Sequence, residues 1–274
     1  MRKIVPVRSF QVGRLKAFVY EDSVTMGAAA AHASAQSLQA CARVNEHMAV
    51  IFATGRSQEE MLSAFTGTPG LPWNKVIAFH MDEYVGIPET HPASFRAFLR
   101  KHLLEKVHLK ASYTIDGDAS NSAQICDAYS KLLQLHQPFL CLLGIGENGH
   151  IAFNDPGVAD FGDPQLVKVV TLDEVCRGQQ VAEGWFPSMA DVPKQAISLT
   201  VPALFRVPKL IVSVPGIRKA KIVKRAFEGT ISTSCPATIL RSHPDATVYL
   251  DCESASLISE MDFSPEMARV QVGD

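Results

Sequence analysis

The stretch that decides the fold is a Gly-rich segment carrying a histidine, Gly144-Ile145-Gly146-Glu147-Asn148-Gly149-His150-Ile151-Ala152-Phe153-Asn154-Asp155-Pro156. It follows an apolar run at residues 139–143 that is typical of a buried strand. In a parallel α/β sheet, ligands bind in the crevice beyond the carboxyl ends of the strands. Glycines let the backbone come close to a ligand, and a histidine can move protons near neutral pH. This loop therefore indicates a functional site.

Helical and strand-like segments alternate along the rest of the chain. The pattern predicts strands at residues 48–53, 75–79, 139–143, 166–171, 210–214 and 247–250. It predicts helices at 23–44, 93–107, 122–135 and 218–227, and a helix from residue 58 that Ser57 caps. Such alternation predicts a three-layer, Rossmann-like α/β domain over residues 1–274, with a mostly parallel central sheet and helices on both faces. Residues 155–164 are the most loop-like region, which we expect to form a flap.

Composition restricts the class of partner. The 274 residues include 26 basic and 28 acidic side chains, so the formal net charge is −2. This balance argues against a nucleic-acid or membrane-surface partner, and no apolar run is long enough to span a membrane. The six cysteines are dispersed, without a CxxC pair or a Cys/His cluster of zinc spacing, and no apolar leader follows the N-terminus. We therefore expect a cytoplasmic protein without a metal.

Polar residues follow three of the predicted strands. The first group is Thr54-Gly55-Arg56-Ser57, between a predicted strand and a predicted helix. Backbone N–H groups at a helix start, together with hydroxyl groups, form an anion site, to which Arg56 would add a bidentate donor. The alternative is an ordinary capped turn.

The second polar strand end carries two adjacent acids, Asp82 and Glu83. A carboxylate held at a strand end can abstract a proton next to a carbonyl group. The alternative is that Asp82 caps the following segment while Glu83 is solvated.

The third strand end carries His150, and a lone histidine is more often structural than catalytic. Its neighbours Asn148 and Asp155 can fix the tautomer of the ring, which favours a functional histidine.

These motifs together resemble one enzyme family. The matching segments are residues 81–86 (Met-Asp-Glu-Tyr-Val-Gly), 91–95 (His-Pro-Ala-Ser-Phe), the loop at 144–156, and the stretches 192–200, 216–220, 231–238 and 243–244, all in the family's order. The chain resembles the glucosamine-6-phosphate deaminases (isomerases), in the wider group that includes the 6-phosphogluconolactonases. The resemblance spans nearly the whole chain.

The resemblance assigns roles to four catalytic positions. It implies that Asp82 moves a proton between C2 and C1 of the sugar, and that His150 opens the sugar ring. Asp155 stands where the family usually has a glutamate that orients the histidine. Asn148 stands where many members have an aspartate.

The resemblance also implies a phosphate site. The segment at 54–57 matches the phosphate loop of the family, the 216–220 segment contributes a lysine, and the Gly-rich segment at 144–156 contributes a glycine. The implied phosphate-site residues are Thr54, Gly55, Arg56, Ser57, Lys219 and Gly146. The loop departs from the family pattern at Arg56 and Gln58. A further arginine that holds phosphate in the family is replaced by Gln180, with Arg177 one turn away. We expect Arg56 or Arg177 to supply the missing charge.

The predicted reaction converts an aminohexose 6-phosphate, with water, to a ketose phosphate and ammonia: glucosamine-6-phosphate to fructose-6-phosphate. A carboxylate and a histidine suffice for the proton transfers, so no cofactor is expected. Two alternatives stay open: a 6-phosphogluconolactonase-type hydrolase, and a non-catalytic sugar-phosphate sensor. The sequence leaves the C4 epimer of the sugar undecided. The expected partner is a small-molecule sugar phosphate, and a homo-oligomer is left open.

Overall fold

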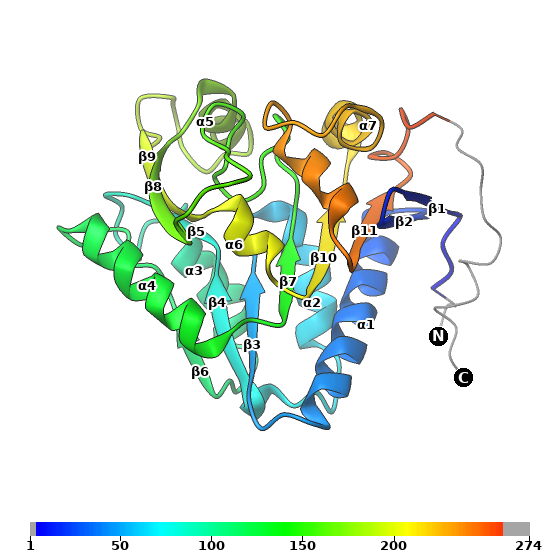
Figure 1. Cartoon of the computed structure of the whole chain (residues 1–274), viewed down its shortest axis with the longest axis horizontal. Helices are drawn as coiled ribbons and strands as arrows, with labels where there is room; N and C mark the ends of the chain where they lie inside the picture. The colour runs from blue at the N-terminus through cyan, green and yellow to red at the C-terminus, as the bar shows by residue number, and fades with distance from the viewer. Residues whose placement is uncertain (1–3, 260–274) are drawn as a thin grey trace.

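A central eight-stranded sheet organises the computed structural model, which describes residues 4–259 (Figure 1). The strands lie in the order β1-β2-β11-β10-β7-β3-β4-β6. Every neighbouring pair is parallel except β1 and β2, which form an antiparallel hairpin at one edge. The strands are β1 Arg8–Val12, β2 Leu15–Tyr20, β3 Met48–Phe52, β4 Val76–His80, β6 Ala111–Tyr113, β7 Leu140–Leu143, β10 Lys209–Val214 and β11 Ala246–Asp251.

The central strands are buried on both faces. In β3, Ala49 and Ile51 belong to one core cluster, whereas Met48, Val50 and Phe52 belong to another. Successive side chains of a strand point to opposite faces, so each central strand supplies both clusters. This is why the parallel strands read as continuous apolar runs rather than as an alternating pattern.

Helices cover both faces of the sheet, which confirms the predicted three-layer α/β architecture (Figure 1). One cluster packs beneath α1 Ser23–Ala42, α2 Glu59–Thr66 and α3 Phe95–Leu99. The other packs beneath α4 Ser122–His136, α6 Val201–Phe205 and α7 Ala220–Glu228. The buried sheet between these helical layers fixes the positions of the loops at its carboxyl edge.

A second, smaller sheet stands beyond that edge, where Figure 1 shows β8, β9 and α5 past the arrowheads of the central strands. It is antiparallel, with the order β5-β9-β8 and the bounds β5 Asp82–Tyr84, β9 Gln195–Leu199 and β8 Val167–Thr171. Helix α5, Glu174–Ala182, joins β8 to the segment before β9. The small sheet and α5 share a core cluster of their own, which includes Tyr84, Phe153, Cys176 and Phe186. The sequence predicted β8 as extended but not the sheet.

Two helix starts differ from the expected ones. Ser57 does not cap α2, because a short 3₁₀ helix, η1 Arg56–Gln58, comes first and the cap position is Gln58 without a side-chain bond. The predicted helix at 93–107 is shorter: Ser94 caps α3, and a π-helical turn, η3 Arg100–Leu104, follows. Three further 3₁₀ helices are η2 Trp73–Lys75, η4 Ile217–Lys219 and η5 Pro236–Ser242.

The contact between α1 and α2 predicts an unusual effect of alanine. A Cβ atom at Gly27 would lie 2.7 Å from the Cβ of Glu60 and 2.9 Å from its carbonyl carbon. Replacing a glycine by alanine within a helix normally raises the folding stability by up to about 1 kcal/mol. We expect Gly27→Ala instead to lower the folding stability by about 1–3 kcal/mol, because overpacking forces the helices apart. Gly178 in α5 is the matched control, since a Cβ there meets nothing within 4 Å. Chemical denaturation measures both; equal stabilisation by both would contradict the prediction.

Candidate active site

The site lies where the order of the strands reverses. From β3 the chain proceeds to β4 and β6 on one side, and β7 then returns to the other side of β3 and continues to β10 and β11. The loops after β3 and β7 therefore diverge from a common crevice, where doubly wound sheets bind ligands. A pocket opens there. The loops after β3, β4, β7 and β10, together with α5, line it with Thr54, Gly55, Arg56, Ser57, Gln58, Met81, Asp82, Phe95, Gly146, His150, Gln179, Gln180, Glu183, Trp185 and Lys219, among others.

The loop after β3 forms one wall of the pocket. Gly55 has a φ of 97°, which lets the chain turn sharply into η1. The Thr54 hydroxyl is buried without a hydrogen-bond partner. The Arg56 guanidinium is exposed and lies 5.5 Å from the centre of the Trp185 ring. This wall therefore offers a hydroxyl and a cation to a ligand in the pocket.

A second cation comes from the loop after β10. Lys219 is buried, with 7% of its surface exposed, and lines the pocket. Burial lowers the pKa of Lys219, while the charges of Glu183 and Glu147 oppose that shift. Lys219 and Arg56 both line the pocket. An ammonium group and a guanidinium group in one pocket are suited to a phosphate.

Asp82 is the carboxylate that faces the pocket. It begins β5 and is 5% exposed. Burial raises its pKa well above the usual range, and the charges of Glu83 and Asp155 raise it further. A carboxylate with a raised pKa accepts a proton more readily than a solvated one, which suits a general base.

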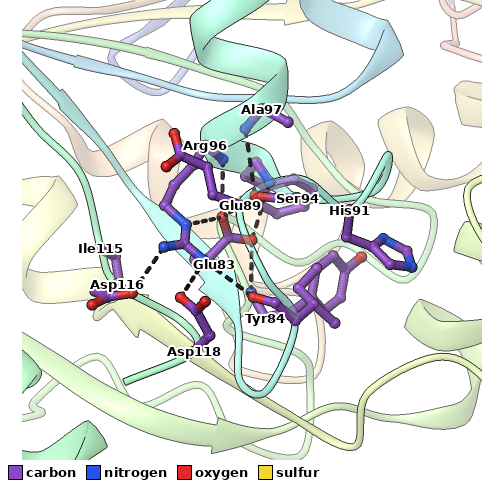
Figure 2. A network of polar contacts seen from close by, with 12 residues as sticks. Glu83, Tyr84, Glu89, His91, Ser94, Arg96, Ala97, Ile115, Asp116 and Asp118 are labelled. Carbon is purple, nitrogen blue, oxygen red and sulfur yellow. Dashed lines mark hydrogen bonds and ion pairs between the residues drawn. The ribbon is translucent and has the colours of Figure 1, made fainter. Parts of the chain in front are cut away.

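The neighbouring acid, Glu83, is fully buried in a network of donors (Figure 2). Its carboxylate accepts hydrogen bonds from the backbone N–H groups of Tyr84, Phe95 and Arg96 and from the Ser94 hydroxyl, and it pairs with the Arg96 guanidinium at 3.2 Å. The alternative in which Glu83 is solvated and Asp82 is a simple cap is wrong. The network ties β5 to the start of α3, so it fixes the backbone that carries Asp82.

The far side of Arg96 extends the same network to another loop. Its guanidinium lies 2.8 Å from a carboxylate oxygen of Asp116 and 2.9 Å from one of Asp118, and it donates to the Ile87 carbonyl (Figure 2). Three segments that follow β4 and β6 are thereby held in one arrangement beside the pocket.

His150 lies opposite, paired with Asp155. The Nδ1 atom of His150 is 2.9 Å from Oδ1 of Asp155, which is fully buried. Burial alone would raise the pKa of Asp155, but the His150 contact and hydrogen bonds from Asn148 and the Asp173 N–H group lower it below its usual value. The structure thus brings together His150 and the acid predicted to orient it.

Gly146 makes room for the His150 ring. A Cβ atom at Gly146 would lie 2.1 Å from Nε2 and 2.2 Å from Cε1 of His150. The sequence placed Gly146 among the substrate-binding residues, and it does line the pocket. The lack of a side chain there also lets the ring sit against the loop backbone.

Asn148 connects the histidine loop to α5. Its side-chain amide donates to Oδ1 of Asp155 and Oδ2 of Asp173, both at 2.9 Å, and its carbonyl oxygen accepts from the His150 N–H group. Asp173 in turn caps α5 through Oδ1. Neither Asn148 nor Asp155 lines the pocket, and both of these predicted catalytic residues contact His150 instead.

Arg177 does not reach the pocket, contrary to the expectation that it could replace a family arginine. Its guanidinium donates to the carbonyl oxygens of Met189 and Val192, which turns it toward the 187–192 segment. Gln180, the residue aligned with that arginine, does line the pocket. Arg56 is therefore the arginine that the structure offers to a ligand.

Helix α5 and the turn after it form a wall that sequence reasoning missed, apart from Gln180. Its further lining residues are Gln179, Glu183 and Trp185. Glu183 accepts from Gln179 and from the Trp185 indole N–H group, so the wall is held by its own hydrogen bonds. The sequence offered one sign of this helix, the capping residue Asp173, because the helix itself is largely polar and has no clear apolar pattern.

Comparisons with known proteins agree with this geometry. The model of the family described as glucosamine-6-phosphate isomerases/6-phosphogluconolactonase matches residues 21–249. A glucosamine-6-phosphate deaminase of Exiguobacterium sibiricum is 37% identical over 185 residues, which are 68% of this chain and 71% of the relative. One of Bacillus thuringiensis is 35% identical over 190 residues, covering 69% and 71%.

Solved structures show the same likeness. A monomeric glucosamine-6-phosphate deaminase superposes with a TM-score of 0.80 and 27% identity, covering 88% of this chain and 99% of that one. The 6-phosphogluconolactonase of Trypanosoma brucei, at 18% identity and a TM-score of 0.73 over 89% and 98% of the two chains, shares the fold. The architecture is thus that of a family of sugar-phosphate enzymes. The chain belongs to the glucosamine-6-phosphate isomerase/6-phosphogluconolactonase family.

Within residues 4–259, none of the helices combines the length and the apolar character that crossing a membrane requires.

The bonds of Asn148 predict the effect of an aspartate at this position. In Asn148→Asp, a third carboxylate faces those of Asp155 and Asp173 and two donated hydrogen bonds are lost. We expect a loss of about 1–3 kcal/mol at neutral pH. The loss should shrink as the pH falls and the carboxylates become protonated.

The double variant Asn148→Asp/Asp173→Asn is the control. An asparagine at 173 returns one donor and still caps α5. Urea denaturation should show partial recovery of stability; a double variant no more stable than Asn148→Asp would contradict the assignment.

Proposed function

We propose that the protein converts glucosamine-6-phosphate and water to fructose-6-phosphate and ammonia. The observation that carries the proposal is that Asp82 and His150, from different strand ends, line one pocket together with Lys219 and Arg56. A general base, a proton-transfer group and a phosphate site are the three elements that this reaction requires.

The residues divide the chemistry as follows. His150 moves the proton of the C1 hydroxyl to the ring oxygen, which opens the sugar to its aldehyde form. Asp82 removes the C2 proton and returns it to C1, while the C1 carbonyl oxygen gains a proton and the amino group loses one, which yields a C1 hydroxyl and an imine at C2. Water then adds to the imine and ammonia departs, leaving the ketose phosphate. The raised pKa of Asp82 helps it to accept the C2 proton, and the pair with Asp155 keeps the His150 ring oriented.

The position of Asp82 favours the deaminase over the lactonase alternative. Hydrolysis of a lactone needs a base for water but no proton abstraction from carbon. Here the carboxylate projects into the same pocket as the histidine, and relatives at 35–37% identity are named as deaminases. A sensor would have no use for either proton-transfer group.

We place the protein in a reducing compartment, the cytoplasm. All six cysteines are free, which supports this location. The absence of a nucleic-acid partner stays a prediction, and a homo-oligomer is left open.

A paired assay tests the reaction and the base together. We expect wild-type protein to release ammonia and fructose-6-phosphate in equal amounts from glucosamine-6-phosphate. Asp82→Asn keeps the shape of the side chain but removes the base, so kcat should fall by about 10²–10⁴-fold. The KM should change little, because Asp82 is not part of the phosphate site.

The control for Asp82→Asn is thermal stability, which should not fall, since the variant removes a buried carboxylate that burial disfavours. Turnover of 6-phosphogluconolactone but not of the amino sugar would establish the lactonase instead. Turnover of galactosamine-6-phosphate alone would assign the other epimer.

The two cations of the pocket make a second prediction. Arg56→Ala and Lys219→Met should each raise the KM for glucosamine-6-phosphate by about 10-fold or more, as expected for loss of a charge-assisted hydrogen bond. Arg177→Ala is the matched control and should leave the KM unchanged, because that guanidinium bonds to carbonyls outside the pocket. An effect of Arg177→Ala on KM as large as that of Arg56→Ala would contradict the placement of the phosphate.

A further inference from the structure

A nitrogen, an oxygen and a sulfur atom converge behind the His150 ring. Nδ1 of His150, a carboxylate oxygen of Asp155 and Sγ of Cys176 all lie within 4.8 Å of one another. The first two come from the loop after β7 and the third from the first turn of α5. In residues 4–259 this is the one group of three such side chains gathered this closely.

The cluster is enclosed. Asp155 is 0% exposed, Cys176 is 1% exposed, and the side chain of His150 is 13% exposed. Nδ1 of His150 is buried and lies 2.9 Å from Oδ1 of Asp155, so an ion bound between the two groups would replace that contact.

The donor set is the one that zinc prefers. Structural and catalytic zinc sites use imidazole nitrogen, thiolate sulfur and carboxylate oxygen, and catalytic sites leave a fourth position open. A tetrahedral ion would hold these three atoms roughly 3.4–3.6 Å apart. The three atoms lie within 4.8 Å of one another, so rotations of the side chains would have to bring them to that spacing. We propose that His150, Asp155 and Cys176 form a site for a zinc-class divalent cation.

Binding has a defined proton balance. A cysteine binds a metal ion as its thiolate, so the Cys176 thiol has to lose its proton. The ion therefore replaces the thiol proton: a sulfur–metal bond forms, and the proton leaves to solvent. Affinity should rise with pH. Since Cys176 and Asp155 do not line the pocket, the ion has to enter past His150, so we expect slow binding.

Occupancy would stop the proposed reaction. The ion takes the nitrogen and the carboxylate that otherwise orient His150, so the ring can no longer move protons at the sugar. Inhibition rests on the proposed function, whereas binding of the ion does not. The site is thus inhibitory rather than catalytic.

Cadmium provides the direct test, because a thiolate bound to it absorbs in the ultraviolet. The experiment uses the full chain with Cys41→Ser and Cys252→Ser, which remove the two cysteines that are not buried. We expect one equivalent of Cd²⁺ to produce the thiolate–cadmium band, and zinc to compete it away. Cys176→Ser in this background should abolish the band, and Cys126→Ser, a buried cysteine elsewhere, should not.

A second variant guards against misfolding of Cys176→Ser. His150→Ala removes a side chain that is partly exposed to the pocket, and it should weaken cadmium binding by at least about 10-fold. Zinc should also inhibit the wild-type enzyme, with recovery on adding EDTA.

The proposal is overturned if the band persists in Cys176→Ser or is absent from the parent protein. A protein that binds cadmium through Cys176 but does not turn over glucosamine-6-phosphate would instead refute the proposed function and leave the metal site standing.

Discussion

The arrangement of the site depends on one topological constraint, the reversal of strand order between β3 and β7. Two loops that leave adjacent parallel strands in opposite directions cannot cover the crevice between them. That crevice receives Arg56 from one loop and His150 from the other. The buried layers on both sides of the sheet hold the strand ends in register, so the functional side chains stand on a rigid base. The small antiparallel sheet and α5 then close the pocket from above.

Three carboxylates near the pocket have different roles because each has different neighbours. Glu83 is surrounded by donors and serves as an anchor for the backbone. Asp155 is held in its charged form by His150 and Asn148. Asp82 faces the pocket, and the two neighbouring charges add to the burial that raises its pKa. The polar network of Figure 2 therefore fixes the position of the Glu83 carboxylate next to the proposed base.

Residues that directly follow a buried strand could be predicted from the sequence, because the apolar run marks the strand and the next residues must lie at its end. This holds for Thr54 and Asp82, whereas His150 lies further along the Gly-rich loop that follows its strand, and the structure places all three in the pocket. Residues whose position depends on distant partners could not be predicted. The burial of Glu83 depends on Arg96, the direction of Arg177 on carbonyls at 189 and 192, and the approach of Cys176 to His150 on the packing of α5. Linear spacing carries no sign of any of these contacts.

The stacking of Arg56 on Trp185 has a consequence for how the pocket can be observed. The chain has two tryptophans, and the other, Trp73, is packed against Phe65 in the core beneath α2. Indole emission responds to a charge lying over the ring, so an anion that draws Arg56 away alters the fluorescence of Trp185 while Trp73 gives a constant background. The molecule thus contains its own optical reporter of pocket occupancy, with an internal standard, and needs no attached dye.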